Sequence, residues 1–466
     1  MVNLFKKLGL KIGAKLTEQV MMRGTPNSLV RAAGILKAVA PKRHKHKIEF
    51  VREKFKQRHC AIMFVLRILK EIRPNFRKKL IDNLIINGML LNTEVRDAHK
   101  SYGNHIPFVM LMSPTMRCNF KCKGCYAADY DFSKEMPLKK WDEIITEGKQ
   151  LGVGLFIFLG GEPFMRKDDL LYLMKKHNDA YFQIYSNGSL LSNTVMDEIE
   201  KLGNVLITFS IEGFEKDTDD RRHPGTYKRL MELMGEFKKR RIPFGYSCCV
   251  TRSNYKTLLS DEFVDFMIDK GAYIGWHFMY MPIGKCPSTD LMLTPEQRKF
   301  MGDRMKYIRN NKALFVVDFW NDAPFVGGCI AGLEYCHINA EGWVEPCIFT
   351  HFATDNVNDK KLVDIFNSKF FRGLRRERYC NKNLYTPCTL IDNPEKMRKL
   401  WADVKPTSTH PAAMTLLNEL APEIDKYSVE VKKVFKGPWE KYVKENPGVL
   451  DKISVYEKWQ KSLTEE

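Results

Sequence analysis

Residues 116–126 read MRCNFKCKGCY, and their three thiols, Cys118, Cys122 and Cys125, follow a C-x3-C-x2-C spacing. The triplet comes directly after the apolar run Ile106–Met112, which has the composition of a buried strand. Zinc sites normally have four ligands arranged in close pairs. Three thiolates without a local fourth one suit a four-iron cluster that leaves one iron free to bind a small molecule. The alternative is a structural or zinc-bound group of cysteines.

From residue 106 the chain alternates short apolar runs with segments of helical period. We expect strands at 106–112, 155–159, 181–185, 205–211, 244–250 and 273–280. We expect helices at 138–151, 168–177, 194–202, 226–241, 261–270 and 295–311. Strands that alternate with helices form a parallel sheet with right-handed crossovers. Six units predict an α/β fold, a partial (β/α)6 TIM-like barrel, whose C-terminal mouth carries the cysteine triplet on a βα loop.

Three further motifs stand at the ends of the next three strands. Gly160-Gly161-Glu162-Pro163 follows the second strand, Tyr185-Ser186-Asn187-Gly188 ends the third, and Ser210-Ile211-Glu212-Gly213 ends the fourth. Paired glycines let a backbone approach a ligand closely. Taken alone, Gly160–Pro163 reads equally well as an ordinary turn between a strand and a helix.

The triplet and these motifs together resemble the radical S-adenosylmethionine (SAM) superfamily, over residues 106–281. The resemblance implies that the free iron binds the amino and carboxylate groups of SAM. One electron from the cluster then cleaves SAM to methionine and a 5′-deoxyadenosyl radical, which abstracts a hydrogen atom from the substrate. It also implies a low-potential electron donor of the flavodoxin or ferredoxin type.

The resemblance also assigns SAM-binding roles to individual residues. Gly160, Gly161 and Glu162 would hold the amino group, and the strand end with Ser186 and Asn187 would meet the ribose. Ser210 and Glu212 belong to a SIDG-type motif that here has Glu in place of Asp, which leaves the role of Glu212 open. Asp220–Arg222 and Gly225–Tyr227 resemble the segment that follows this motif. Arg252 is a candidate for the SAM carboxylate, and Tyr126 would lie near the adenine.

A second group of cysteines follows the predicted barrel. Cys329 and Cys347 fit C-x12-G-x4-C, with Gly342 in a hairpin turn within His337–Thr350. This pattern resembles the opening of the SPASM or twitch extension, which binds auxiliary iron–sulfur clusters. The later thiols needed for two clusters are missing, so we expect one at most. The preferred ligands are Cys329, Cys347 and Cys388, with Cys380 or Cys336 as the fourth; the alternative is a zinc-bound or thiol-rich structural subdomain.

The start of the chain is strongly basic. Residues 1–80 hold 21 Lys or Arg and 4 Glu, a net charge of +17, which leaves +2 for the other 386 residues. Helical spacing runs throughout 1–105, and near the start apolar Leu8, Ile12 and Leu16 face away from the lysines. Such a region is suited to bind the surface of an anionic membrane, where it would hold the barrel mouth close to lipid. Otherwise it caps the barrel and stays solvated.

Three substrate classes follow from these features. Hydrogen abstraction from a membrane lipid acyl chain is favoured by the basic helices. A peptide is the second candidate because many SPASM proteins modify peptides, although residues 1–105 show no strand trio of a leader-binding module. RNA is disfavoured because the basic stretch lacks interleaved aromatic residues. A non-catalytic iron–sulfur or zinc protein is the competing class, and it would have no need of a SAM pocket.

The sequence predicts a reduced compartment and four regions. Clustered thiols, no cleavable signal and no apolar run of membrane-spanning length indicate a cytoplasmic protein, with peripheral contact at the inner face of the membrane. The regions are a basic helical segment at 1–105, the radical SAM barrel at 106–312, the auxiliary-cluster domain at 313–400 and a helical tail at 401–466.

Overall fold

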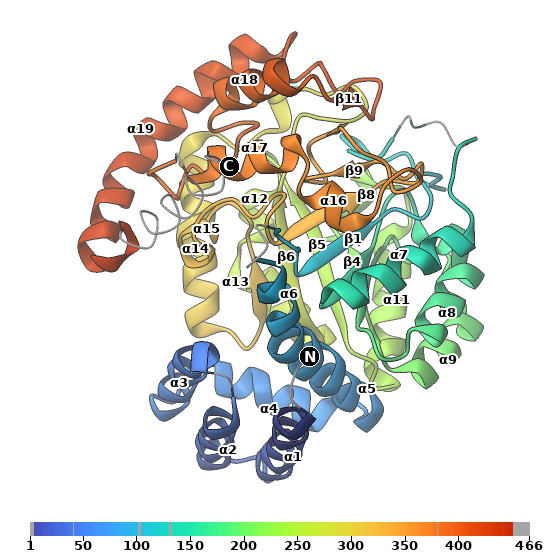
Figure 1. Ribbon diagram of the computed structural model, residues 1–466, viewed down its shortest axis with the longest axis vertical. Helices are drawn as coiled ribbons and strands as arrows, with labels where there is room; N and C mark the ends of the chain where they lie inside the picture. Colours follow the sequence, from blue (N-terminus) through green and yellow to red (C-terminus); the bar gives the residue numbers. More distant parts are fainter. Residues whose placement is uncertain are drawn as a thin grey trace.

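The computed structural model describes residues 4–40, 42–100, 104–128, 130, 133–379 and 381–450. Its sheet strands are β1 (Val109–Met112), β2 (Leu155–Phe158), β3 (Phe182–Ser186), β4 (Val205–Ser210), β5 (Phe244–Val250), β6 (Ala272–Met279), β7 (Phe315–Val317), β8 (Tyr335–Ile338) and β9 (Val344–Glu345). They form one sheet in the order β7-β6-β5-β4-β3-β2-β1-β8-β9 (Figure 1). Every neighbouring pair is parallel except β8 and β9. The predicted α/β partial barrel is therefore confirmed.

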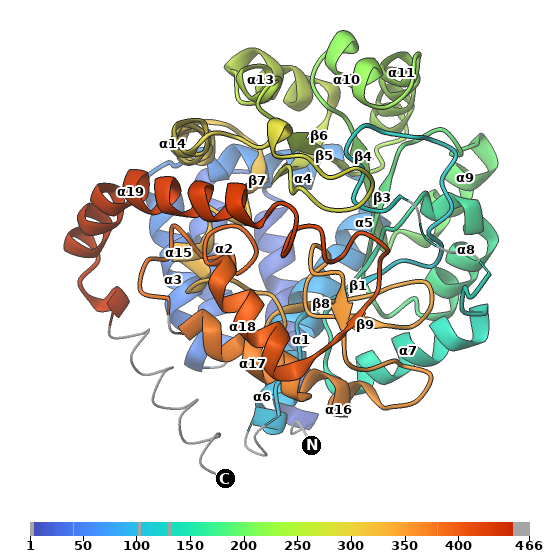
Figure 2. The ribbon, with the colours of Figure 1, turned by 90° about the horizontal axis from the view of Figure 1, so that it is seen from above.

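Helices cover the outer face of this curved sheet (Figures 1 and 2). They are α7 (Leu138–Leu151), α8 (Lys167–Lys176), α9 (Asn193–Leu202), α10 (Glu215–Arg221), α11 (Thr226–Lys239), α12 (Tyr255–Leu258), α13 (Asp261–Lys270) and α14 (Pro295–Asn311). Their ends follow local chemistry. Thr294 and Gln297 form a capping box that begins α14, and Gly271 adopts a left-handed conformation that ends α13.

The two faces of the sheet differ in composition. Met110, Phe158 and Phe182 belong to the outer face and are fully buried beneath helices. Alternate residues point to the other face. There Tyr185 and Trp276 are partly exposed, whereas Ile157 and Leu159 are buried against Ile348 of the C-terminal part. The main apolar core therefore lies between sheet and helices, and a smaller apolar cluster covers part of the inner face.

The N-terminal helices close the floor of the barrel. They are α1 (Leu4–Met21), α2 (Pro26–Val39), α3 (Lys42–Lys56), α4 (Ala61–Glu71), α5 (Pro74–Lys79), the π-helix η1 (Leu80–Leu91) and α6 (Asn92–Lys100). The Arg67 guanidinium donates to the carbonyls of Ala272 and Ala313, and the Asn83 amide donates to that of Ala180. Ala272 is the first residue of β6, and Ala313 and Ala180 lie just before β7 and β3. The helices therefore pack at the N-terminal ends of the strands.

This placement corrects one expectation. We predicted that the basic helices would hold the barrel mouth close to lipid, but they lie at the opposite end of the barrel (Figure 1). The alternative prediction, a basic region that caps the barrel, agrees with the structure. Among the described residues, no helix has the length and apolar character needed to cross a membrane.

The C-terminal part packs along the other side of β1. It contains α15 (Ala323–Val326), the β8–β9 hairpin, the pair β10 (Phe352–Ala353) and β11 (Thr407–Ser408), α16 (Leu362–Phe366), α17 (Lys369–Tyr379), α18 (Pro394–Val404) and α19 (Ala421–Glu445). Strand β8 pairs in parallel with β1 and extends the barrel sheet. A fully buried ion pair between Arg298 and Asp392 joins α14 to the segment before α18. In the tail, Trp439 packs on Tyr385, while Trp459 lies outside the described residues.

Candidate active site

The loops after four strands meet at the C-terminal end of the sheet. The backbone N–H of Glu162, after β2, donates to the Arg117 carbonyl at 2.8 Å. The N–H of Lys123 donates to the Arg221 carbonyl, after β4, at 2.9 Å, and Lys285, after β6, donates to the Cys125 carbonyl at 3.4 Å. The cysteine loop is thus held from three sides by main-chain hydrogen bonds.

Glycines allow these backbones to come so close. A Cβ on Gly161 would lie 2.1 Å from the Arg117 carbonyl oxygen, and one on Gly160, where φ is +117°, would lie 2.5 Å from that of Thr115. A Cβ on Gly284 would lie 2.5 Å from the Cys125 carbonyl oxygen. Only glycine fits such contacts without displacing backbone. The two glycines predicted for SAM binding therefore also shape the cysteine loop.

Cys118, Cys122 and Cys125 all lie on this loop and are suited to a cluster. Cys118 is exposed, the other two are half-buried, and the Phe120 N–H donates to Cys118 Sγ at 3.4 Å. Although the residue is exposed, partial desolvation of its sulfur, with Glu162 and the other two thiols nearby, raises the pKa of Cys118 to about 11; burial raises that of Cys125, so loading with iron must release protons. In the described part of the chain no three His, Cys, Asp or Glu side chains converge as a single metal ion needs. In a four-iron cluster each thiolate binds a different iron.

Glu162 joins the second and third predicted motifs. Its carboxylate accepts from the Ser186 hydroxyl at 2.9 Å, the Asn187 N–H at 2.8 Å and the Phe164 N–H at 3.1 Å. Glu162 is 1% exposed, and burial raises its pKa to about 7 despite these hydrogen bonds. Asn187 also donates to Asn119 on the cysteine loop at 3.0 Å. Glu162, Ser186 and Asn187 thus form one network beside the thiols.

Glu212 has its partners within the chain. Its carboxylate accepts from Arg221 at 2.6 Å, from Arg222 at 2.9 Å and from the Cys249 N–H at 2.9 Å, and it is fully buried. The Arg221 carbonyl in turn holds the cysteine loop. Glu212 therefore positions the segment after β4, whereas the predicted neighbour Ser210 lies half-buried at the strand end, level with Ser247.

The two remaining residues predicted to bind SAM lie on loops at the C-terminal end of the barrel. Arg252 is exposed, and its Nε donates to the Met292 carbonyl at 3.0 Å. Tyr126 follows the last thiol of the triplet and packs edge-on against Phe349, with ring centroids 6.1 Å apart. Tyr126 therefore links the cysteine loop to the segment after β9.

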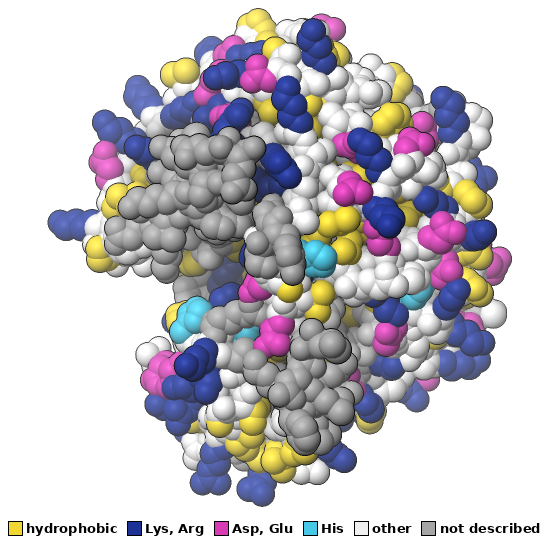
Figure 3. Space-filling model, viewed as in Figure 1, with side chains coloured by type: hydrophobic (Ala, Val, Ile, Leu, Met, Phe, Trp, Pro, Cys, Tyr) yellow, Lys and Arg dark blue, Asp and Glu magenta, His cyan; other side chains and the backbone are white. Residues whose placement is uncertain are grey.

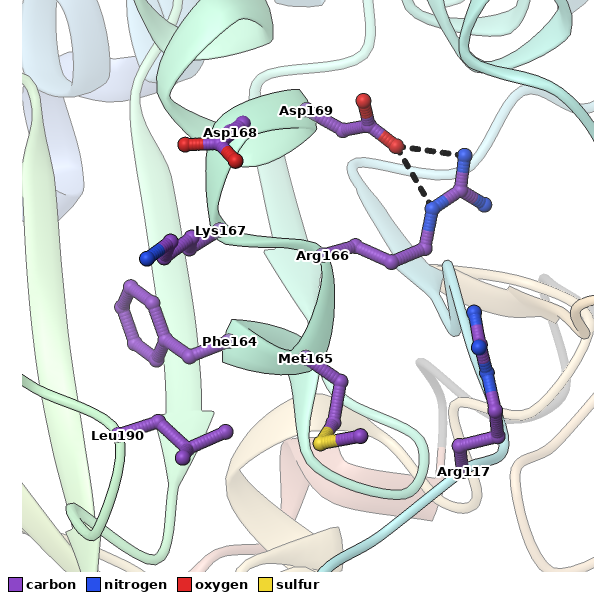
Figure 4. A pocket seen from close by; sticks show the side chains of 8 residues that line it. All are labelled: Arg117, Phe164, Met165, Arg166, Lys167, Asp168, Asp169 and Leu190. Carbon is purple, nitrogen blue, oxygen red and sulfur yellow. Dashed lines mark hydrogen bonds and ion pairs between the residues drawn. The ribbon is translucent and has the colours of Figure 1, made fainter.

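A pocket of about 510 Å³ borders these residues without containing any of them (Figure 4). Arg117, which precedes Cys118, faces it from the cysteine loop, and Phe164 and Met165 line it beyond Glu162. Arg166 extends toward Asp169 in Figure 4, and its Nε donates to that carboxylate at 2.7 Å. Arg166 also donates to the Pro114 carbonyl at 2.7 Å, so it braces the chain entering the cysteine loop.

The second cysteine group also comes together in part. Cys329 acts electrostatically on both Cys347 and Cys388 and raises the pKa of each, after burial as the main cause. The Phe349 N–H donates to Cys347 Sγ and the Leu390 N–H to Cys388 Sγ, both at 3.4 Å. Hydrogen bonds to sulfur are typical of iron–sulfur sites. Cys380 lies outside the described residues.

Cys336 stands apart from this group. It lies on β8 opposite Met110, on the buried outer face of the sheet, and burial alone raises its pKa. It was one of two candidates for a fourth ligand, and its position favours Cys380 instead.

Sequence reasoning missed several polar residues between the two cysteine groups. His337 bridges Ser113 Oγ at 2.7 Å and Glu345 Oε2 at 2.6 Å, and all three residues are buried. The Tyr335 hydroxyl donates to Cys347 Sγ at 2.7 Å. The available signal was the predicted hairpin, which places His337 and Glu345 side by side across its two strands.

Aromatic rings fill the inner face between these groups. Phe278 stacks on Phe319 with centroids 5.3 Å apart, and Phe319 lies 6.0 Å from Tyr335. On the other side Phe278 lies 6.4 Å from Phe349, which contacts Tyr126. A continuous row of rings therefore runs from the residue after Cys125 to the hydroxyl at Cys347.

Comparison with known families agrees with this arrangement. Residues 112–265 match the model of the radical SAM superfamily, and residues 329–390 match SPASM, an iron–sulfur cluster-binding domain. The chain is a radical SAM enzyme with a SPASM domain. The radical SAM domain implies a [4Fe–4S] cluster with SAM, and the SPASM domain implies auxiliary iron–sulfur binding.

Relatives of this radical SAM enzyme act on different substrates. The chain is 26% identical over 296 residues to the AdoMet-dependent heme synthase of Oleidesulfovibrio alaskensis, covering 56% of this chain and 75% of that protein. It is 26% identical over 283 residues to the PqqA peptide cyclase of Ruegeria pomeroyi, covering 56% and 74%. The crystal structure of Streptococcus suis SuiB bound to S-adenosylmethionine shares the fold, with a TM-score of 0.50 and 19% identity over 75% of this chain and 81% of SuiB.

Gly161→Ala tests the close backbone approach. We expect it to displace the Arg117 carbonyl, so that the protein loses about half of its iron and binds SAM at least tenfold more weakly. Iron analysis and equilibrium dialysis of SAM measure both effects. The control is Gly235→Ala in α11, where an added Cβ meets no atom within 4 Å and helix propensity improves by about 0.5–1 kcal/mol. Normal iron and SAM binding in Gly161→Ala would contradict the assignment.

Proposed function

We propose that this enzyme abstracts a hydrogen atom from its substrate at the C-terminal mouth of the barrel. The observation that carries the proposal is the meeting of Cys118, Cys122 and Cys125 with the Glu162–Ser186–Asn187 network. Bound there, the cluster and SAM supply a 5′-deoxyadenosyl radical. The thiols would hold three irons, the Gly160–Glu162 turn would bind the SAM amino group, and Ser186 and Asn187 would orient the ribose.

The other predicted residues have supporting roles in this proposal. Tyr126 would border the adenine, and Ser210 and Arg252 would complete the rim of the SAM site. Glu212 acts through Arg221 and Arg222, to which it is bound. We keep the four predicted regions, with boundaries at 105, 312 and 400, as the proposed division of the chain.

The auxiliary cluster is proposed as a single one, held by Cys329, Cys347, Cys388 and Cys380. The electrostatic effect of Cys329 on Cys347 and on Cys388, and the N–H groups that donate to the sulfurs of these two, support this set. Such a cluster serves either to accept an electron from the substrate radical or to bind substrate through an open iron.

A peptide is the substrate class that we favour. Curated relatives include the PqqA peptide cyclase and the sporulation killing factor maturation protein SkfB of Bacillus subtilis. The inner face offers the rings of Tyr185, Trp276 and Phe278, which suit apolar or aromatic side chains. An acyl chain is disfavoured because the basic helices close the floor and do not stand at the mouth.

The proposed electron donor is an acidic protein of flavodoxin or ferredoxin type. Cys118 is exposed, and the cations Arg117, Lys121 and Lys123 beside it are exposed as well. A positive surface around a reducible cluster attracts a negatively charged partner and speeds its encounter.

A peripheral membrane contact through the floor is a separate proposal. Ile12 and Leu16 on α1 are 53% and 48% exposed, and Phe50 on α3 is 64% exposed. Figure 3 shows apolar side chains at the lower edge of the molecule, over the N-terminal helices, with Lys and Arg around them. Apolar side chains ringed by cations suit an anionic leaflet, where each Lys or Arg gains about 1 kcal/mol.

The radical function is tested on anaerobically reconstituted protein. We expect about eight irons per chain, as two [4Fe–4S] clusters require, and 5′-deoxyadenosine after addition of dithionite and SAM. A Cys118/Cys122/Cys125→Ala variant should keep about four irons and form no 5′-deoxyadenosine. Cys60→Ala, which changes a thiol on the N-terminal side, is the matched control.

The iron content separates the two parts of this prediction. Four irons with product would keep the radical enzyme and remove the auxiliary cluster. Bound zinc, without iron or product, would overturn both.

Tyr335→Phe tests the auxiliary ligand set. A hydrogen bond to a ligating thiolate stabilises the reduced cluster, so removing the hydroxyl should lower the reduction potential. We expect about a tenfold fall in the ratio of reduced to oxidised cluster at fixed potential, which is about 59 mV for one electron. An EPR-monitored titration in the Cys118/Cys122/Cys125→Ala background isolates this cluster. Tyr385→Phe, in the same domain, should leave the midpoint unchanged, and an unchanged midpoint in Tyr335→Phe would remove Cys347 from the set.

The membrane contact is tested by co-sedimentation with phosphatidylglycerol vesicles. We expect an Ile12→Asp/Leu16→Asp variant to bind at least tenfold more weakly, because two apolar side chains no longer enter the interface. Val429→Asp on α19, where the side chain is 67% exposed, is a control far from the floor. Equal loss in the control, or no binding by the unaltered protein, would refute the contact.

A further inference from the structure

A cationic pocket lies where the N-terminal helices meet the barrel. Its volume is about 430 Å³, and four of its lining side chains are positively charged. These are Arg23, Lys70, Arg77 and Arg241. The other lining residues are Met22, Gly24, Leu69 and Pro74. The pocket thus combines a cluster of cations with a short apolar wall.

Arg77 is the buried cation of the pocket. It is 8% exposed, and its Nη1 donates to the carbonyls of Leu69 at 2.8 Å and Ile72 at 2.9 Å. Its Nε is buried and has no hydrogen-bond partner among the described residues. Burial and the nearby Arg241 lower the pKa of Arg77, and Glu18 opposes them. The hydrogen bonds that the structure gives Arg77 go to neutral carbonyls, so its positive charge favours an anion in the pocket that it lines.

Arg241 combines an unusual backbone conformation with hydrogen bonds to the end of α4. Its φ is +58°, in the left-handed region that non-glycine residues rarely occupy. Its side chain lies across the end of α4, where Nε donates to the Glu71 carbonyl at 3.0 Å and Nη2 to that of Lys70. Arg23 and Lys70 are exposed at the pocket. The described lining residues include these four cations and no carboxylate, which leaves the site positive.

We propose that this pocket binds a phosphate group, carried by a phospholipid headgroup or free in solution. Arginine recognises phosphate through paired N–H donors, and lysine adds a mobile charge. Met22 is 46% exposed and lies one residue past α1, the helix that carries Ile12 and Leu16. A lipid phosphate would therefore enter the pocket while its acyl chains meet the apolar side chains of the floor. The inference extends the proposed membrane contact and does not depend on the radical chemistry.

The test uses full-length reconstituted protein without SAM or reductant, so its result is independent of 5′-deoxyadenosine formation. Calorimetric titrations compare inorganic phosphate with dihexanoyl-phosphatidylglycerol below its micelle concentration. We expect Arg23→Gln/Lys70→Gln to weaken binding of the favoured probe at least tenfold. The matched control is Lys42→Gln/Lys47→Gln on α3, which removes the same charge from exposed positions away from the pocket and should stay within twofold.

Each outcome bears on the proposal. Tighter binding of the lipid than of phosphate supports a headgroup site, and equal binding of the two supports a site for free phosphate. Equal weakening in both double variants would mean diffuse charge attraction and would overturn the pocket. Absence of binding by either probe to the unaltered protein would overturn it as well. The substituted side chains are exposed, so these variants should fold.

Discussion

The close contact between two backbones at the barrel mouth is the constraint on which the site depends. The β2 turn lies against the cysteine loop so tightly that Gly161 leaves no room for a Cβ beside the Arg117 carbonyl. The Glu162 N–H then binds that carbonyl, and the Glu162 carboxylate binds Ser186 and Asn187 on the next strand. One short turn therefore fixes the thiols and the predicted SAM-binding strand end in a common frame. Parallel strands make this possible because their C-terminal ends lie at one edge.

Buried polar contacts tie the SPASM domain to that frame. His337 on β8 reaches Ser113 at the end of β1, five residues before Cys118, and also binds Glu345. On the opposite side, Arg298 of α14 pairs with Asp392, which accepts from the Cys388 N–H at 2.9 Å. Removing one partner of a buried ion pair costs about 3–5 kcal/mol. Such contacts keep the two cysteine groups at a fixed separation, with aromatic rings between them.

The sequence predicted the barrel well because its signals are local. Motifs marked the ends of the predicted strands, and the predicted helices 138–151 and 295–311 begin and end where the structure has them. The thiol triplet, the glycine turn and the strand end with Ser186 and Asn187 were located from local sequence for the same reason, and the structure brings them together. The position of the basic helices was not predictable, because it depends on distant carbonyls, such as those that Arg67 and Asn83 reach across the floor. The partners of Glu212 and the outward direction of Cys336 likewise depend on register, which composition does not reveal.

The separation of floor and mouth limits what the basic region does for catalysis. Strand β6 has eight residues, and at about 3.3 Å per residue it is about 26 Å long. An acyl chain in a leaflet at the floor would have to leave the bilayer by about that distance, at about 0.8 kcal/mol per CH₂ removed from hydrocarbon. A peptide in water pays no such cost to reach the mouth. The proposed membrane contact and the proposed substrate entry therefore lie at opposite ends of the barrel, so the charge of the first 80 residues fits the proposed attachment better than it fits substrate binding.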